Sequence, residues 1–134
     1  MSRAHIPVAL RRRVSARASS RCEYCMIHED DSFLGCEVDH IISEKHGGET
    51  DEANLAFCCF YCNRYKGSDL STLGAKGLLV RLFNPRKDRW DAHFKFQALQ
   101  ILGLTSIGKA TARLLRFNDP ARLEERAAMT RPRK

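Results

Sequence analysis

The chain has 134 residues, of which 43% are hydrophobic and 8% aromatic, and its formal net charge is +7. This composition is typical of a globular protein with a modest core and excludes a disordered polypeptide. No apolar run approaches the roughly 20 residues of a transmembrane helix, and the first residues lack the apolar stretch of a secretory signal. We therefore expect a cytoplasmic protein that forms a single domain over residues 1–134.

The charge is distributed unevenly along the chain. Residues 1–21 carry six arginines and no acidic residue, residues 22–63 carry ten acidic residues against Lys45 alone, and residues 64–134 carry sixteen basic and six acidic residues. An acidic centre between basic flanks suits a cation site whose surroundings bind a polyanion. The same distribution also suits a surface whose charge only keeps the protein in solution, so charge alone leaves both interpretations open.

The first half of the chain is predicted to contain two helices with two short strands between them. The pattern of apolar residues predicts helices over residues 5–22 and about 52–65. Apolar and β-branched residues predict strands over residues 33–38 and 40–42, with Asp39 between the two.

The second half is predicted to be helical after a mostly irregular connector over residues 68–90. Three helices are expected over residues 91–102, 105–117 and 119–129, and Thr105 is a candidate N-cap of the second. The last four residues are expected to be frayed.

Two Cys-x-x-Cys pairs, separated by 33 residues, predict a metal site. Four thiolates at this spacing satisfy a tetrahedral zinc ion, and in a reducing compartment they favour metal over disulfides. Cys58 could replace one ligand, but the pair would then be separated by three residues, so we prefer the symmetrical set. Cys36 is expected to be a small core residue. The predicted ligands are Cys22, Cys25, Cys59 and Cys62.

Four polar residues inside this zinc frame point to further chemistry. Asp39 offers the hard oxygen that Mg²⁺ or Mn²⁺ prefers, and the adjacent His40 can take a proton from water near neutral pH. Asn63 follows the last zinc ligand directly, and Asn54 is predicted to begin a helix and bind the strand that carries His40. Each residue alone has an ordinary structural interpretation, but the combination favours a hydrolytic site.

The segment from Arg21 to Gly67 resembles the HNH endonucleases. The resemblance is carried by the Asp-His pair at 39–40, the His-Gly-Gly turn at 46–48, the Asn-Leu pair at 54–55 and the closing Cys-x-x-Cys-Asn. It implies an α+β fold, in which a zinc-stapled ββα-metal finger is the core over residues 22–67. A basic N-terminal helix within residues 1–21 and a basic helical region over residues 68–134 would flank this finger.

The resemblance also implies roles for the polar residues. His40 would be the general base, Asn54 would orient it, and Asp39 and Asn63 would hold one catalytic Mg²⁺ or Mn²⁺ ion. The family's third position is often His and is Asn63 here. The implied reaction is hydrolysis of DNA phosphodiester bonds to 5′-phosphate and 3′-hydroxyl ends, with zinc in a structural role.

Basic residues on both sides of this segment are candidates for phosphate contacts with DNA. The candidates are Arg11, Arg12, Arg13, Arg64 and Lys66. An alternative is a zinc-binding module that binds DNA without cutting it; it explains the cysteines and arginines but not the three site residues Asp39, His40 and Asn63. A disulfide scaffold is a third, weaker alternative. The sequence leaves open whether His46 contributes to the site.

Overall fold

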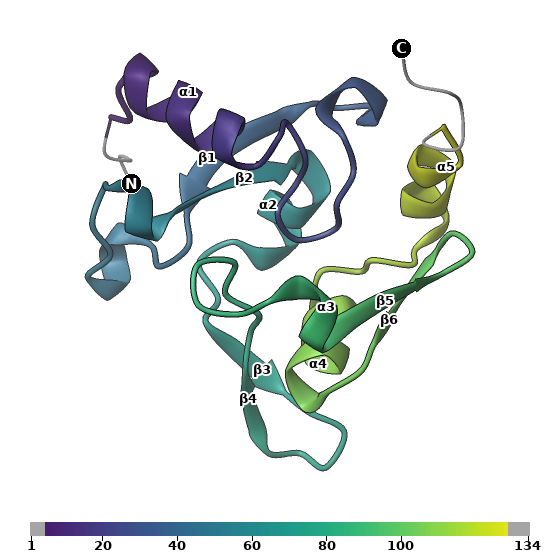
Figure 1. Cartoon of the computed structure of the whole chain (residues 1–134). Helices are drawn as coiled ribbons and strands as arrows, with labels where there is room; N and C mark the ends of the chain where they lie inside the picture. The colour runs from purple at the N-terminus through teal and green to yellow at the C-terminus, as the bar shows by residue number, and fades with distance from the viewer. Residues whose placement is uncertain (1–4, 129–134) are drawn as a thin grey trace.

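The computed structural model describes residues 5–128, and the fold is a mixed one of short helices and small antiparallel sheets (Figure 1). The described residues contain three sheets of two strands each. This agrees with the predicted α+β class. The fraying expected for residues 131–134 lies outside the described residues.

The predicted ββα finger is present. Strand β1 (Cys36–His40) pairs antiparallel with β2 (Leu55–Cys59), so that Cys36 lies opposite Cys59 and His40 opposite Leu55. Helix α2 (Phe60–Lys66) follows β2 without a loop and ends at Gly67, whose φ is positive at 51°. The turn between the strands contains two short 3₁₀ helices, Glu44–His46 and Glu52–Asn54.

Helix α1 (Val8–Arg17) covers the face of the strand pair that points away from α2 (Figure 1). This confirms the predicted N-terminal helix, with Pro7 just before its first residue. The buried residues between α1 and the strands form one apolar cluster: Ile6, Leu10, Val14, Leu55 and Phe57.

The predicted strands of the finger were wrong in their positions. Asp39 lies within β1 rather than between two strands, and the second strand is β2, in a segment predicted to be helical over residues 52–65. The physical reason is burial on both faces. All five residues of β2 are buried, because α1 covers one face and α2 the other. A doubly buried strand is a continuous apolar run, which has no period to distinguish it from a buried helix.

The connector over residues 68–90 is less irregular than predicted. It contains a hairpin of β3 (Ser71–Leu73) and β4 (Leu79–Arg81), followed by the start of helix α3 (Trp90–His93).

The helix predicted over residues 91–102 is also wrong. After α3 the chain forms a hairpin of β5 (Phe94–Gln97) and β6 (Gln100–Gly103). Ala98 in the turn has a positive φ of 54°, and the sequence Phe-Lys-Phe-Gln alternates as a strand does. The last two helices are confirmed as α4 (Ser106–Leu114), capped by the Thr105 side chain, and α5 (Pro120–Ala128).

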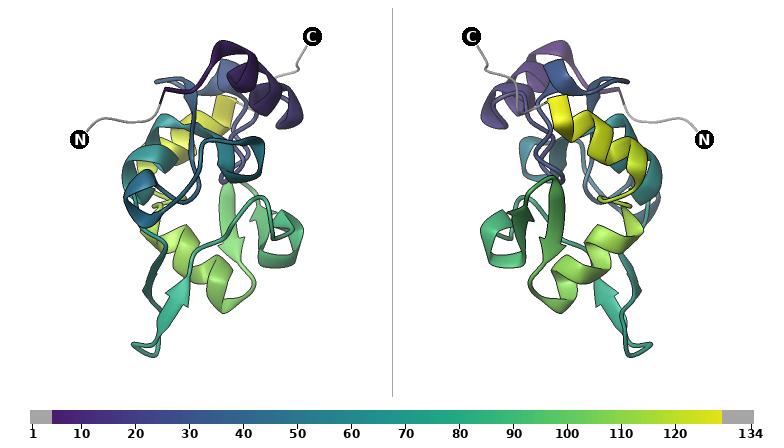
Figure 2. Two further views of the ribbon diagram at one scale, coloured as in Figure 1. Left: turned by 90° about the vertical axis from the view of Figure 1, so that its left-hand side faces the viewer. Right: turned by 90° about the vertical axis from the view of Figure 1, so that its right-hand side faces the viewer.

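The larger apolar cluster joins the finger to the C-terminal region. It packs the cysteine knuckles and Ile41 against Phe83, Phe94, Ile101 and Phe117. Figure 2 shows α1 and the β3–β4 hairpin at opposite ends of the molecule. No helix among residues 5–128 is long and apolar enough to cross a membrane.

Candidate functional site

The predicted cysteines form a buried cluster at the junction of β2 and α2 with the N-terminal knuckle. The Sγ atoms of Cys22, Cys25, Cys59 and Cys62 all lie within 4.8 Å of one another. The sulfurs of Cys25 and Cys59 are 3.7 Å apart, and two sulfurs bound to one tetrahedral zinc would be about 3.8 Å apart for Zn–S bonds of about 2.3 Å. The donor set and its spacing therefore fit zinc.

Backbone hydrogen bonds hold each knuckle in the shape that a metal needs. The amides of Tyr24 and Cys25 donate to the sulfur of Cys22 over 3.4 Å, and the amide of Cys62 donates to the sulfur of Cys59 over 3.5 Å. Cys58 is excluded from the cluster, because in β2 it points to the face opposite Cys59. The structure thus selects Cys59, as the spacing predicted, and Cys36 also lies outside the cluster.

The electrostatics of the cluster also favour a cation. Burial raises the pKa of the Cys22 and Cys62 thiols well above the ordinary value. Four thiolates packed this closely in a dry interior would repel one another unless a positive charge lies among them.

One positive charge comes from the C-terminal helix. Arg122 of α5 is only 1% exposed. Its Nη2 donates to the sulfur of Cys62 over 3.0 Å and to that of Cys59 over 3.6 Å. Its Nη1 donates to the carbonyl of Leu115 over 2.7 Å. Burial opposes the charged guanidinium, but the nearby sulfurs outweigh it and raise the pKa of Arg122.

The second group of predicted residues begins at the end of β1. His40 is buried, and its Nε2 lies 2.8 Å from the hydroxyl oxygen of Thr50 in the loop between the strands. Its Nδ1 lies 3.8 Å from Oδ1 of Asp39. The strand alternation predicts opposite directions for these two neighbours, yet the last residue of the strand brings their side chains together.

Asn54 closes the loop that follows β1. Its side-chain oxygen accepts from the amide of Ile42 over 3.0 Å, and its Nδ2 donates to the carbonyls of Ile42 and Glu49. Its backbone carbonyl accepts from the amide of Ile41. Asn54 therefore binds the backbone just past His40, although it precedes a strand rather than beginning a helix.

Gly48 makes this closure sterically feasible. A Cβ atom at this position would lie 1.7 Å from the carbonyl oxygen of Ile42 and 2.7 Å from Nδ2 of Asn54. Only glycine permits so close an approach of the loop to the Asn54 side chain.

Asn63 and Lys66 project from α2 toward β1. Nδ2 of Asn63 donates to Oε1 of Glu37 over 2.7 Å. Glu37 and Asp39 share one face of β1, since Val38 between them packs toward α1. The structure thus brings Asn63 to the face of β1 that carries Asp39, with Glu37 as the residue it contacts.

Lys66 lies differently from the other predicted phosphate contacts. It is buried, and its Nζ donates to the carbonyl of Ile41 over 2.7 Å. Burial lowers its pKa, while the negative charge of Asp39 acts in the opposite direction. Lys66 therefore ties α2 to the end of β1, where its charge stands near Asp39.

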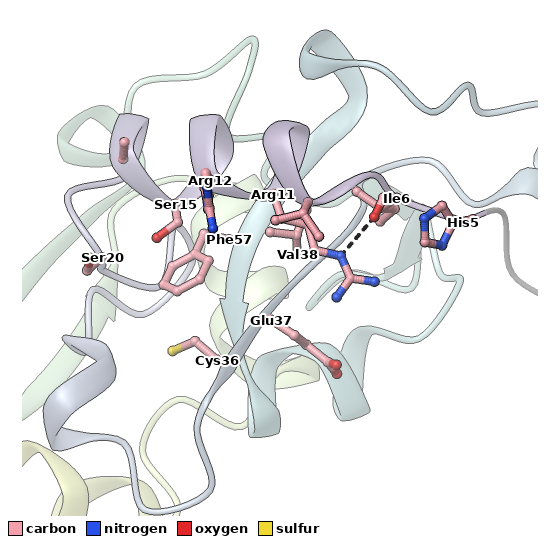
Figure 3. A pocket seen from close by; sticks show the side chains of 12 residues that line it. His5, Ile6, Arg11, Arg12, Ser15, Ser20, Cys36, Glu37, Val38 and Phe57 are labelled. Carbon is pink, nitrogen blue, oxygen red and sulfur yellow. Dashed lines mark hydrogen bonds between the residues drawn. The ribbon is translucent and has the colours of Figure 1, made fainter.

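The predicted arginines are exposed. Arg11 and Arg12 lie on α1 beside a cavity of about 790 Å³ between this helix and β1, and Arg11 donates to the carbonyl of Ile6 (Figure 3). Arg13 pairs with Glu52 in the loop between the strands. Arg64 lies on α2, over the ring of Phe60.

Sequence reasoning missed three residues of this region: Glu37, Thr50 and Arg122. Glu37 has a detectable signal, because it is two residues before Asp39 and must share its face if both belong to one strand. Thr50 and Arg122 have no local signal. Their contacts come from a loop ten residues beyond His40 and a helix 60 residues beyond Cys62.

Comparison with known proteins agrees with this geometry. The family model described as HNH endonuclease matches residues 22–69, which contain the four clustered cysteines and the ββα finger. Neither the comparison with curated proteins nor the comparison with solved structures found a match. The segment from Cys22 to Asp69 therefore carries an HNH endonuclease match, which covers about a third of the chain.

Proposed function

We propose that the protein is a metal-dependent endonuclease that hydrolyses phosphodiester bonds of DNA. The observation that carries the proposal is the setting of His40. It ends β1 of a finger that matches the HNH endonuclease family model, beside Asp39, with its Nε2 within hydrogen-bond distance of Thr50.

The contact with Thr50 supports His40 as the general base. If Nε2 carries the proton and donates it to the Thr50 hydroxyl, Nδ1 keeps a free electron pair on the side of Asp39. A water molecule on that side would give its proton to Nδ1 while it attacks the phosphorus atom. Asn54 and Gly48 would hold the loop that carries Thr50, so they would orient the histidine indirectly.

Oxygen donors near His40 suit a hard divalent cation. Asp39 and Asn63 are the proposed ligands, and the contact between Asn63 and Glu37 adds a second carboxylate. Because Nδ2 of Asn63 donates to Glu37, its Oδ1 is the atom that it would offer to Mg²⁺ or Mn²⁺. Such an ion, when bound, would stabilise as a Lewis acid the negative charge that develops on the phosphate. The bond from phosphorus to the 3′-oxygen would break, and this oxygen would take a proton from solvent, so the products would be 5′-phosphate and 3′-hydroxyl ends.

Zinc is proposed to have a structural role in the cysteine cluster. The cluster is buried, and its four sulfur ligands would fill the tetrahedral coordination of a zinc ion. No position on the zinc would then be open for water or phosphate. The exposed arginines Arg11, Arg12, Arg13 and Arg64 are the proposed phosphate contacts. Lys66 is not proposed as a phosphate contact, because its buried amine donates to the carbonyl of Ile41.

The test is the nicking of supercoiled plasmid by zinc-loaded protein, with Mg²⁺, with Mn²⁺ and without either. His40→Ala should lower the rate at least about a hundredfold, the scale of a lost general base. Zinc content, melting temperature and DNA affinity should stay close to those of the wild type. His46→Ala, a change of an exposed histidine in the adjacent turn, reports whether that side chain contributes.

If no divalent ion supports cutting, or if His40→Ala cuts at the wild-type rate, the nuclease assignment fails. DNA binding that persists without cutting would then favour the non-catalytic zinc module.

A further inference from the structure

The β3–β4 hairpin exposes leucines that the core does not use. Leu73, Leu78 and Leu79 are 56%, 68% and 73% exposed. Leu73 and Leu79 are cross-strand partners, so their side chains share one face of the hairpin. Val80 points to the other face and lines a cavity against α4. Leu73 and Leu79 therefore lie on the outer face, and Leu78 lies at the rim of the same cavity as Val80. Such an exposed apolar group is typical of an interaction surface.

Basic side chains lie next to these leucines. A cavity of about 440 Å³ between the hairpin and α4 is lined by Lys76, Leu78, Lys109 and Arg113, with no acidic residue among its described lining residues. The segments 70–80 and 105–114 contain no aspartate or glutamate. Arg113 also donates to the carbonyl of Leu73, which ties the hairpin to the helix.

This combination favours one kind of partner. Exposed apolar side chains beside several uncompensated cations match a nucleic acid, whose phosphates attract the cations while its sugars and base edges accept apolar contacts. A symmetric dimer through the same patch would bring identical cations of two copies close together, which is unfavourable.

We propose that the β3–β4 hairpin and α4 form a DNA contact surface separate from the finger. Lys76, Lys109 and Arg113 bind phosphates, and Leu78 and Leu79 at the end of the hairpin pack against sugars and bases in a groove. This inference rests on the proposed function only in taking DNA as the partner. The hairpin and α1 lie at opposite ends of the molecule (Figure 2), so this surface and the α1 arginines would contact separate parts of the DNA.

The test compares two pairs of substitutions with two matched controls. The pairs are Lys76→Gln with Lys109→Gln, and Leu78→Ser with Leu79→Ser. The charge control is Lys87→Gln with Lys95→Gln, two exposed lysines elsewhere, and the apolar control is Phe33→Ser with Leu34→Ser, which are 58% and 56% exposed. The affinity of zinc-loaded protein for a labelled DNA duplex is measured by fluorescence anisotropy without added Mg²⁺ or Mn²⁺, over a range of salt concentrations.

The lysine pair should weaken binding at least fivefold and reduce the slope of log K against log salt by about 2, since each phosphate contact contributes about 0.9. The leucine pair should weaken binding at least fivefold without changing this slope. Both control pairs should bind within twofold of the wild type.

Two results would overturn the inference. One is target pairs that bind DNA as tightly as their controls. The other is a leucine pair that converts a dimer to a monomer in sedimentation while its DNA affinity is unchanged, which would assign the patch to a second copy of the chain. Because binding is measured without cutting, failure of the nuclease assignment in the plasmid assay would leave this result standing, and the reverse also holds.

Discussion

The contact between Arg122 and the cysteine cluster predicts that a helix at the end of the chain controls zinc affinity. Arg122→Met removes the guanidinium while it keeps much of the side-chain volume. The change deletes the 3.0 Å hydrogen bond to the Cys62 sulfur and the longer one to Cys59. It also removes the positive charge of the buried guanidinium from beside the four sulfurs.

The magnitude follows from the nearer bond. A hydrogen bond to a charged group contributes about 1.5–3 kcal/mol, and each 1.4 kcal/mol is about tenfold in affinity. Arg122→Met should therefore raise the zinc dissociation constant by about 10- to 150-fold. The zinc dissociation constant of Arg122→Lys should fall between those of the wild type and Arg122→Met, because lysine keeps the charge but lacks the planar fork that reaches both sulfurs.

Arg126→Met is the matched control. Arg126 is also buried on α5, at 2% exposed, but its guanidinium donates to the carbonyls of Leu99 and Phe117 rather than to sulfur. Loss of either arginine weakens the packing of α5, whereas only Arg122 contacts the zinc ligands. The difference between the two variants thus isolates the sulfur contact.

The assay is equilibrium competition for zinc with a chromogenic chelator, together with thermal melting of each zinc-loaded variant. We expect similar melting temperatures for the two methionine variants and a higher zinc dissociation constant for Arg122→Met. The reasoning is refuted if the two zinc dissociation constants agree within threefold.

Three further predictions concern the ligands, the loop and the surface. Cys59→Ser should lose zinc and Cys58→Ser should retain it, as elemental analysis would report; the opposite pattern would contradict the cluster geometry. Gly48→Ala should slow plasmid nicking more than Gly47→Ala, because a Cβ at 48 meets Ile42 and Asn54, whereas a Cβ at 47 meets nothing within 4 Å and adds only the strain of the positive φ of 90° there; a smaller effect at 48 than at 47 would contradict this role of the loop. The hydrogen bond from Arg81 lowers the pKa of Asp88 below its ordinary 3.8, so its stabilisation is present above about pH 4 and is lost as the pH falls through the lowered pKa. Asp88→Asn should thus melt at a lower temperature than the wild type at neutral pH. The difference corresponds to about 1 kcal/mol or less, since Arg81 is half exposed, and it should disappear in acid. A difference that does not depend on pH would contradict the ion pair.

Much of the site was predictable from the sequence because it rests on short-range patterns. The Cys-x-x-Cys spacing identified the cluster and preferred Cys59 to Cys58, since two intervening residues let both sulfurs reach one ion. The Asp39-His40 pair and Asn54 were singled out for their chemistry, and the ββα order came from the resemblance. The caps at Pro7 and Thr105 depend only on neighbouring residues, so α1 and α4 were predicted correctly.

Other features were decided only by the tertiary structure, because they depend on what lies across space. The run Leu-Ala-Phe-Cys-Cys is a strand because α1 and α2 cover both of its faces, and no local pattern records that cover. The segment 94–103 is a hairpin although its residues also suit a helix. Arg122 reaches the knuckles from 60 residues away, and Thr50 reaches His40 across the loop. The sequence does not distinguish an arginine in a helix, or a threonine in a turn, that faces solvent from one that contacts a buried partner. Only the packing of the chain therefore assigned these two residues to the site.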